Sequence, residues 1–370
     1  MFGNQRELFR VLGWLRERFP HHPYVYFGLS GATLLYEALK TQTRESIVLP
    51  AYICPKLSAV AVRAGKRLIH LDADRLTQLP NMAQLETYLA CQDASDTVVL
   101  IDHSFGYPFP GLTILRRKFP KLLVIEDCAR ALGVRICGRF PGEQSDWILF
   151  SMYKTIRGSS NGAVLLTNTP IPLRAGRRVS ATVRERVATI APLRFIHSVL
   201  QRTRPDFRPQ LSDLTLPEWT PKYGLPSELC MARFAAELKE FEPRASMRSA
   251  ISEELTDSLS RVDGIKCIKA VEGCQSAGHF VSFNIRKRQT RDQILARLRK
   301  KGLFLSPGWY AVPAHYHSFS ETFPSGHASS EHLAEHIAHI PVSLFLSSKQ
   351  RRRLVPELCD LILEYENGTV

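Results

Sequence analysis

Residues 122–168 read LLVIEDCARALGVRICGRFPGEQSDWILFSMYKTIRGSSNGAVLLTN, and we expect the fold to be organised around this stretch. One apolar run ends in two acids, Glu126 and Asp127, and a second run, WILFS, is soon followed by Lys154. Short apolar runs between turn residues predict buried strands. Because ligands of α/β sheets sit beyond the carboxyl ends of the strands, an acid and a lysine are expected to face one crevice there.

The same alternation surrounds this stretch. Apolar strands are expected near residues 24–28, 46–52, 67–74 and 97–102, with amphipathic helices between them. Almost fully apolar strands that alternate with helices are typical of a parallel sheet covered on both faces. The predicted fold class is therefore α/β, with a mostly parallel central sheet flanked by helices on both faces and a smaller α+β domain at the C-terminus.

The length of 370 residues suits a large domain joined to a smaller one. We expect an N-terminal amphipathic helix within 1–23, a large ligand-binding domain at 24–240 and a small C-terminal domain at 241–370. The segment 170–211 is rich in arginine and has apolar residues enough for helices. A solvated helical face, a pocket for a phosphate-rich substrate, a partner subunit and a membrane surface all remain open for it.

Charge and cysteine usage narrow the class of protein. The formal net charge of +14 predicts a surface that attracts anions, such as phosphorylated small molecules or an anionic lipid surface. No zinc-finger spacing, RNP-like signature or helix-turn-helix signal supports a nucleic-acid partner. The eight cysteines form no CxxC pair and no metal-ligand spacing, so we expect reduced thiols, a cytoplasmic protein and no metal site. No apolar run reaches the roughly 18 residues of a membrane span.

The crevice residues match the needs of one cofactor. Pyridoxal phosphate requires a lysine, a carboxylate beside its pyridine nitrogen, donors for its phosphate and a face over its ring. Lys154 and Asp127 meet the first two needs, with Lys154 as the group that moves protons. Gly31 and Ala32 lie where a predicted strand turns into a predicted helix, whose free N–H groups favour a phosphate. We therefore interpret the crevice as a pyridoxal-phosphate site.

Five motifs of this chain resemble those of the DegT/DnrJ/EryC1/StrS family of pyridoxal-phosphate enzymes, mostly sugar aminotransferases of fold type I. They are SGATLL at 30–35, LPAY at 49–52, HSFGYP at 103–108, EDCARALG at 126–133, and Lys154 followed by NGAV at 161–164. The resemblance implies a homodimer with a shared active site and glutamate as the amino donor. It also assigns roles by position: phosphate amides to Gly31 and Ala32, a phosphate hydroxyl to Ser151, the ring-nitrogen carboxylate to Asp127, and a covalent aldimine to Lys154.

The chain departs from this family at several positions. Arg130 stands where the family usually has Gln or His, beside the cofactor's phenolic oxygen. Cys54 stands where the family often places its ring-stacking aromatic, so Tyr52 or Phe105 would cover the ring. The segment KYGLPSE at 222–228 does not match the family's interface motif.

The leading functional hypothesis is an aminotransferase that moves an amino group from an amino-acid donor to a keto acceptor, plausibly a sugar that carries phosphate. Two alternatives stay open. One is another reaction of the same cofactor, such as dehydration, decarboxylation or C–S chemistry. The other is a non-catalytic binding or regulatory descendant, peripheral to membranes through its basic helices. His103 is interpreted as a hydrogen-bonded structural histidine rather than a catalytic one. His315 and His317 lie too close together, without a further ligand, to indicate a metal site.

Overall fold

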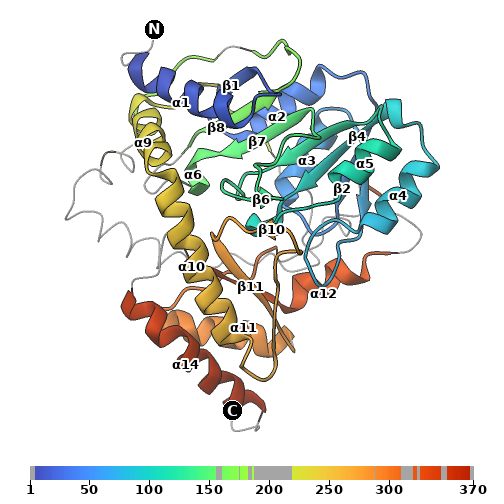
Figure 1. The fold of residues 1–370 in the computed structure, drawn as a ribbon. Coiled ribbons are helices and arrows are strands. Elements are labelled where there is room, and N and C mark those ends of the chain that lie inside the picture. Colours follow the sequence, from blue (N-terminus) through green and yellow to red (C-terminus); the bar gives the residue numbers. More distant parts are fainter. Residues whose placement is uncertain are drawn as a thin grey trace.

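The computed structural model describes residues 5–155, 161–174, 176–181, 186, 219–286, 288–309, 320–322, 326–342 and 348–366. Its centre is a sheet with the strand order β1-β8-β7-β5-β4-β2-β3-β12 (Figure 1). These strands span Tyr24–Gly28 (β1), Ser46–Pro50 (β2), Arg67–Leu71 (β3), Thr97–Asp102 (β4), Leu123–Asp127 (β5), Trp147–Ser151 (β7), Ala163–Thr167 (β8) and Ser320–Thr322 (β12). The predicted α/β class is confirmed.

Strand direction brings the functional ends together. Strands β7, β5, β4, β2, β3 and β12 run parallel, and β8 pairs antiparallel with both β1 and β7. Strand β1 therefore points the same way as the parallel set. The carboxyl ends of β1, β7, β5, β4 and β2 all lie at one edge of the sheet, where the crevice was expected.

Helices cover both faces of this sheet. Helices α2 (Gly31–Lys40) and α3 (Pro55–Arg63) pack their apolar residues on one face. Helices α4 (Met82–Ala90), α5 (Leu112–Lys118), α1 (Gln5–Arg18) and α9 (Glu228–Lys239) cover the other (Figure 1). The expected N-terminal amphipathic helix is α1. Helix α2 begins after Ser30 because the Ser30 hydroxyl accepts a hydrogen bond from the Thr33 N–H at 3.2 Å.

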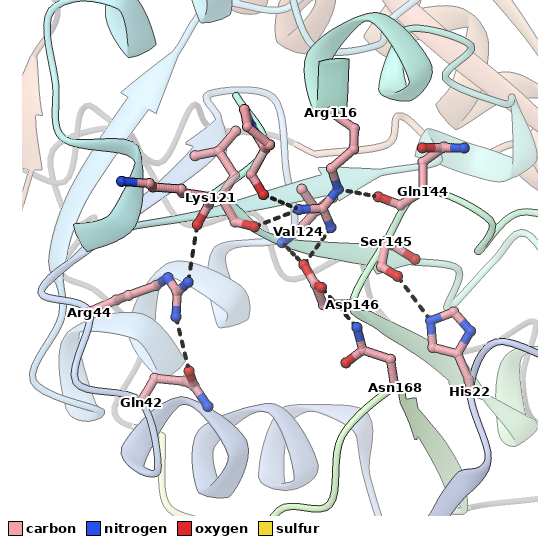
Figure 2. A network of polar contacts seen from close by, with 12 residues as sticks. His22, Gln42, Arg44, Arg116, Lys121, Val124, Gln144, Ser145, Asp146 and Asn168 are labelled. Atoms are coloured by element: carbon pink, nitrogen blue, oxygen red, sulfur yellow. Dashed lines mark hydrogen bonds and ion pairs between the residues drawn. The ribbon is translucent and has the colours of Figure 1, made fainter. Parts of the chain in front are cut away.

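A polar network joins the strands at the opposite, amino-terminal edge of the sheet (Figure 2). The Asp146 carboxylate, in the turn before β7, accepts hydrogen bonds from the Arg116 guanidinium at 2.6 Å, the Val124 N–H at 2.8 Å and the Asn168 side-chain amide at 2.9 Å. Arg116 also donates to the Leu122 carbonyl at 2.7 Å. This network fixes the start of β5 against β7 and the end of β8.

The C-terminal part of the chain forms its own small sheet, β13-β11-β9, below the large one in Figure 1. Its elements are α10 (Phe241–Leu259), β9 (Ile265–Cys267), β11 (Phe280–Ile285), α11 (Arg288–Lys300), α12 (Ala328–His336), β13 (Ile337–Pro341) and α14 (Ser348–Glu366). Helices α10, α11 and α14 enclose its apolar core. Strands β6 (Arg135–Ile136) and β10 (Cys274–Gln275) pair between the two units.

The short strand β12 belongs to the C-terminal part by sequence, yet it pairs with β3 of the large sheet. The predicted division at residue 240 coincides with the start of α10 at Phe241, but the domain limits stay a prediction. No helix in the described part of the chain is long and apolar enough to cross a bilayer.

Candidate active site

Two carboxylates meet at the carboxyl edge of the sheet. Asp127 ends β5 and Asp102 ends β4, and the two residues are direct partners in the parallel register. Partners in neighbouring strands project their side chains to the same face, here the face covered by α2. One Asp127 oxygen, Oδ1, accepts a hydrogen bond from the Ala129 N–H at 2.8 Å, and Asp102 Oδ2 accepts one from the Ser104 hydroxyl at 2.8 Å.

Both carboxyls bind protons more tightly than free carboxyls do. Burial, followed by the charge of Asp127, raises the pKa of Asp102 to about 7. Burial also raises the pKa of Asp127, while the nearby charge of Lys154 lowers it. The two groups therefore titrate as a pair, because the charge of Asp127 opposes the ionisation of Asp102.

Lys154 lies on the short helix α6 (Met152–Thr155), which begins directly after β7 ends at Ser151. Its charge acts on both Asp127 and Asp102, so the predicted acid and lysine lie near each other at this edge of the sheet. The Lys154 side chain is partly buried, and its ammonium lies 6.0 Å from the centre of the Tyr153 ring. Among the described residues it makes no ion pair or hydrogen bond, which leaves its amine available to a ligand.

The predicted phosphate donors lie at the start of α2, close to β7. A Cβ on Gly31 would lie 3.2 Å from the Leu149 side chain, so the absence of a side chain lets the helix start approach this strand. The Ser30 hydroxyl caps the N–H of Thr33. Gly31 and Ala32 come before it in the first turn of the helix, where N–H groups have no partner within the helix and point out of its end. Ser151 is buried two residues beyond Leu149 on the same face. These three residues lie at the carboxyl edge of the sheet, where the start of α2 meets β7.

Glu126 points to the opposite face of β5 from Asp127 and is fully buried against His103. The two side chains lie 2.8 Å apart, from His103 Nε2 to Glu126 Oε2. His103 Nδ1 accepts a hydrogen bond from the Phe109 N–H at 3.0 Å, so Nε2 carries the proton that Glu126 accepts. His103 is hydrogen-bonded as expected, and its structural rather than catalytic role stays a prediction.

Tyr52 and Phe105, predicted to cover a cofactor ring, lie in a buried cluster between the two units. Phe105 stacks on His339 with ring centres 3.6 Å apart, and the Tyr52 hydroxyl lies 3.3 Å from His339 Nε2. His339 Nδ1 in turn lies 2.7 Å from the Ser282 hydroxyl of β11. Phe105 has a φ of 54°, a left-handed backbone that a bulky residue adopts only where packing holds it. The role of both rings over a cofactor stays a prediction.

Arg130 lies in the turn after β5, three residues beyond Asp127. Its guanidinium lies over the rings of Phe105, Phe280 and Trp309, with distances to the ring centres of 4.7, 5.3 and 4.8 Å. Its positive charge also opposes the rise in the pKa of Asp127 that burial causes. Arg130 therefore stands between the crevice and the C-terminal unit.

Sequence reasoning missed Asp102. The signal was present, since Asp102 ends an otherwise apolar strand in the same way as Asp127 does. Other predicted features lie outside the described residues: most of the arginine-rich segment, including 187–211, and the loop with His315 and His317. Among the described arginines of that segment, Arg174 lies over the Tyr223 ring at 4.8 Å and Arg178 lies 3.8 Å from Glu228.

Known proteins share this fold along nearly the whole chain. The aminotransferase TlmJ from Streptoalloteichus hindustanus superposes with a TM-score of 0.71 at 19% identity, over 96% of this chain and 92% of that one. A DegT DnrJ EryC1 StrS aminotransferase from Brucella abortus gives a TM-score of 0.70 at 18% identity, over 97% and 90%. These likenesses show the fold, which is that of fold type I pyridoxal-phosphate enzymes.

Sequence similarity is concentrated in the large sheet. The profile of the DegT/DnrJ/EryC1/StrS aminotransferase family matches residues 25–190, which include Asp127 and Lys154. Over this stretch the chain is similar to this family. A curated relative, UDP-N-acetyl-3-dehydro-alpha-D-glucosamine 3-aminotransferase from Acidithiobacillus ferrooxidans, is 24% identical over 144 residues. That match spans 38% of this chain and 38% of the relative.

Proposed function

We propose that the protein is a pyridoxal-phosphate-dependent aminotransferase that moves an amino group from an amino-acid donor, glutamate, to a keto-sugar acceptor that carries phosphate. The observation that carries this proposal is the meeting of Asp127 and Lys154 at the carboxyl edge of a sheet with the fold of this family. The name of the curated relative, which describes a nucleotide-linked keto-sugar, supports the acceptor class.

The residues of the crevice fit this cofactor. Asp127 is buried, and among the described residues only one of its oxygens has a hydrogen-bond donor. A buried carboxylate with an unmet oxygen is costly unless a donor or a cation faces it. A protonated pyridine nitrogen would supply both. The N–H groups of Gly31 and Ala32 with the Ser151 hydroxyl would bind the phosphate, because a helix N-terminus favours an anion.

When bound, the cofactor supplies an electron-accepting ring that stabilises negative charge on the carbon that carries the amine. Asp127 keeps the ring nitrogen protonated through its carboxylate. Lys154 Nζ would hold the cofactor covalently, and once the donor amine replaces it, its free amine would take up and return the proton of the substrate carbon. The short helix α6 places this lysine directly after β7, where its charge acts on Asp127.

The direct test is to load purified protein with pyridoxal phosphate, reduce it with borohydride and locate the modified peptide by mass spectrometry. We expect the label on Lys154, and we expect the Lys154→Ala variant to bind the cofactor without a covalent link and without transamination. A label on another lysine, or transamination by Lys154→Ala, would contradict the proposal. The matched control is Lys118→Ala, since Lys118 pairs with Glu86 on the surface at 2.7 Å.

The proposal includes a homodimer with a shared active site, which the family resemblance implies, and a cytoplasmic location, which the cysteine usage favours. Sedimentation of the loaded protein tests the dimer. Peripheral membrane contact through basic helices stays a prediction, which cosedimentation with anionic vesicles checks.

A further inference from the structure

Arg130 is held in place by aromatic rings from both parts of the chain. Phe105 follows β4 of the large sheet, whereas Phe280 opens β11 and Trp309 follows it in the C-terminal unit. Cation–π contacts with three rings restrict a long side chain that would otherwise sample many rotamers. The direction of the guanidinium is therefore set before any ligand arrives.

The Arg130 guanidinium has no anionic partner in the described part of the chain. Among the described residues, no carboxylate or carbonyl accepts a hydrogen bond from it. Two other arginines show the usual outcome: Arg116 binds the Asp146 carboxylate at 2.6 Å, and Arg135 binds Glu242 at 3.0 Å. A guanidinium has five N–H donors in a planar fork that matches a carboxylate. A fixed fork with unmet donors is suited to receive a planar anion.

The position of Arg130 makes that anion a reactant. Its charge acts on Asp127, on the Tyr52 hydroxyl and on His339, so the guanidinium lies at the border of the crevice. Lys154, which also acts on Asp127, approaches from the end of β7. An amino acid whose amine reacts at Lys154 would bring its α-carboxylate, one carbon away, into the same crevice.

We propose that Arg130 binds the α-carboxylate of the amino donor and thereby selects amino acids over simple amines. This inference rests on the proposed function. The same fork would also bind the cofactor's phenolic oxygen. The two sources share an anionic oxygen and differ in when they appear: the phenolic oxygen is present before the donor, and the carboxylate arrives with it.

The test compares loaded wild-type protein with Arg130→Gln, Arg130→Lys and the control Arg135→Gln. Arg135 also lies over an aromatic ring, Phe140 at 3.5 Å, but it already has a carboxylate partner. The donor half-reaction is followed by cofactor absorbance with L-glutamate and with 4-aminobutyrate, which lacks only the α-carboxylate. Cofactor affinity and absorbance before donor addition are measured in parallel.

We expect Arg130→Gln to lower the second-order rate constant for L-glutamate about 10- to 100-fold, the loss typical of a charge-assisted bidentate contact. The rate constant for 4-aminobutyrate should change less than about 2-fold, since it never made that contact. Arg130→Lys should be intermediate because it keeps the charge and loses the fork. Arg135→Gln should match the wild type. Equal losses for both donors, or altered cofactor affinity and absorbance without a donor, would assign the fork to the phenolic oxygen and overturn the proposal.

A binding measurement separates this inference from the proposed function. L-2-Methylglutamate carries the α-carboxylate but has no α-proton to lose, so it binds without transamination. If the wild type transaminates no amino acid yet binds this compound at least about 10-fold more tightly than Arg130→Gln does, the carboxylate site stands and the aminotransferase proposal fails. Equal affinities of the two proteins would remove the carboxylate site whatever the activity.

Discussion

Charged side chains at the two edges of the central sheet differ in how many hydrogen bonds they make within the chain. At the amino-terminal edge, the Asp146 carboxylate accepts three hydrogen bonds, including one from Arg116 (Figure 2). At the carboxyl edge, Asp127 accepts one backbone N–H among the described residues, and its nearest charged neighbour in the register is another carboxyl, Asp102. Among the described residues, the Asp146 carboxylate at the amino-terminal edge is hydrogen-bonded within the chain. At the carboxyl edge, donors and acceptors remain available to a ligand.

This difference separates stability from function. A matched network stabilises the fold because each buried polar group has a partner. An unmatched set destabilises the fold slightly, and it persists where a ligand completes it. The raised pKa of Asp102, about 7, is the signature of such an incomplete set. Substitutions at the two edges should therefore change different measured quantities.

The largest expected effect is that of Asp127→Asn. It removes the carboxylate that would keep the cofactor's ring nitrogen protonated, and we expect transamination to fall about 100- to 1,000-fold. The melting temperature of the cofactor-free protein should stay equal or rise, because a buried carboxyl with an unfavourable environment is neutralised. Steady-state kinetics and thermal unfolding measure the two quantities. Full activity in Asp127→Asn would show that this carboxylate is not part of the site.

The same substitution at the other edge, Asp146→Asn, should give the reverse pattern. It places an amide opposite Arg116 and the Val124 N–H, which both need an acceptor. We expect the free energy of unfolding to fall by about 2 kcal/mol, with activity per folded molecule unchanged. Chemical denaturation followed by fluorescence provides the value. A loss of activity without a loss of stability would break the contrast between the edges.

Much of this contrast was predictable from sequence. Apolar runs that end in Asp127 and precede Lys154 placed both residues at one edge, because strand direction in a βα alternation is regular. The position of Gly31 and Ala32 at a helix start followed from the same regularity.

Other features depend on contacts that no local pattern encodes. Strand β12 joins β3 from about 250 residues further along the chain, and Tyr52 meets His339 across 287 residues. No local sequence pattern predicts the three aromatic rings around Arg130, because Phe280 and Trp309 reach it only through the packing of the two units. Glu126 and Asp127 were treated as two acids at one strand end, although the period of two in a strand places one in the core and one in the crevice.

A smaller effect is expected from Asp102→Asn, visible in its pH dependence. The folded protein holds the Asp102 proton up to about pH 7, whereas an unperturbed Asp has a pKa of 3.8. This contribution to stability is present in full below pH 4 and is lost as the pH rises through about 7. The excess stability of the cofactor-free wild type over Asp102→Asn should therefore shrink between about pH 4 and pH 7. A difference independent of pH would contradict the raised pKa of Asp102.

The smallest expected effect is that of Tyr52→Phe, a substitution at the carboxyl edge itself. Tyr52 lies at this edge after β2, yet its hydroxyl is matched by His339 Nε2 at 3.3 Å and its ring is fully buried. Tyr52→Phe should therefore act like a change in a hydrogen-bonded structural network. It keeps the ring, removes the hydroxyl's hydrogen bonds with His339 and the Trp309 backbone, and leaves His339 Nε2 unpaired. We expect a loss of about 1 kcal/mol in the free energy of unfolding and unchanged cofactor affinity. If cofactor affinity falls instead while stability holds, the Tyr52 hydroxyl belongs to the ligand site, and matching within the chain does not by itself mark a structural residue.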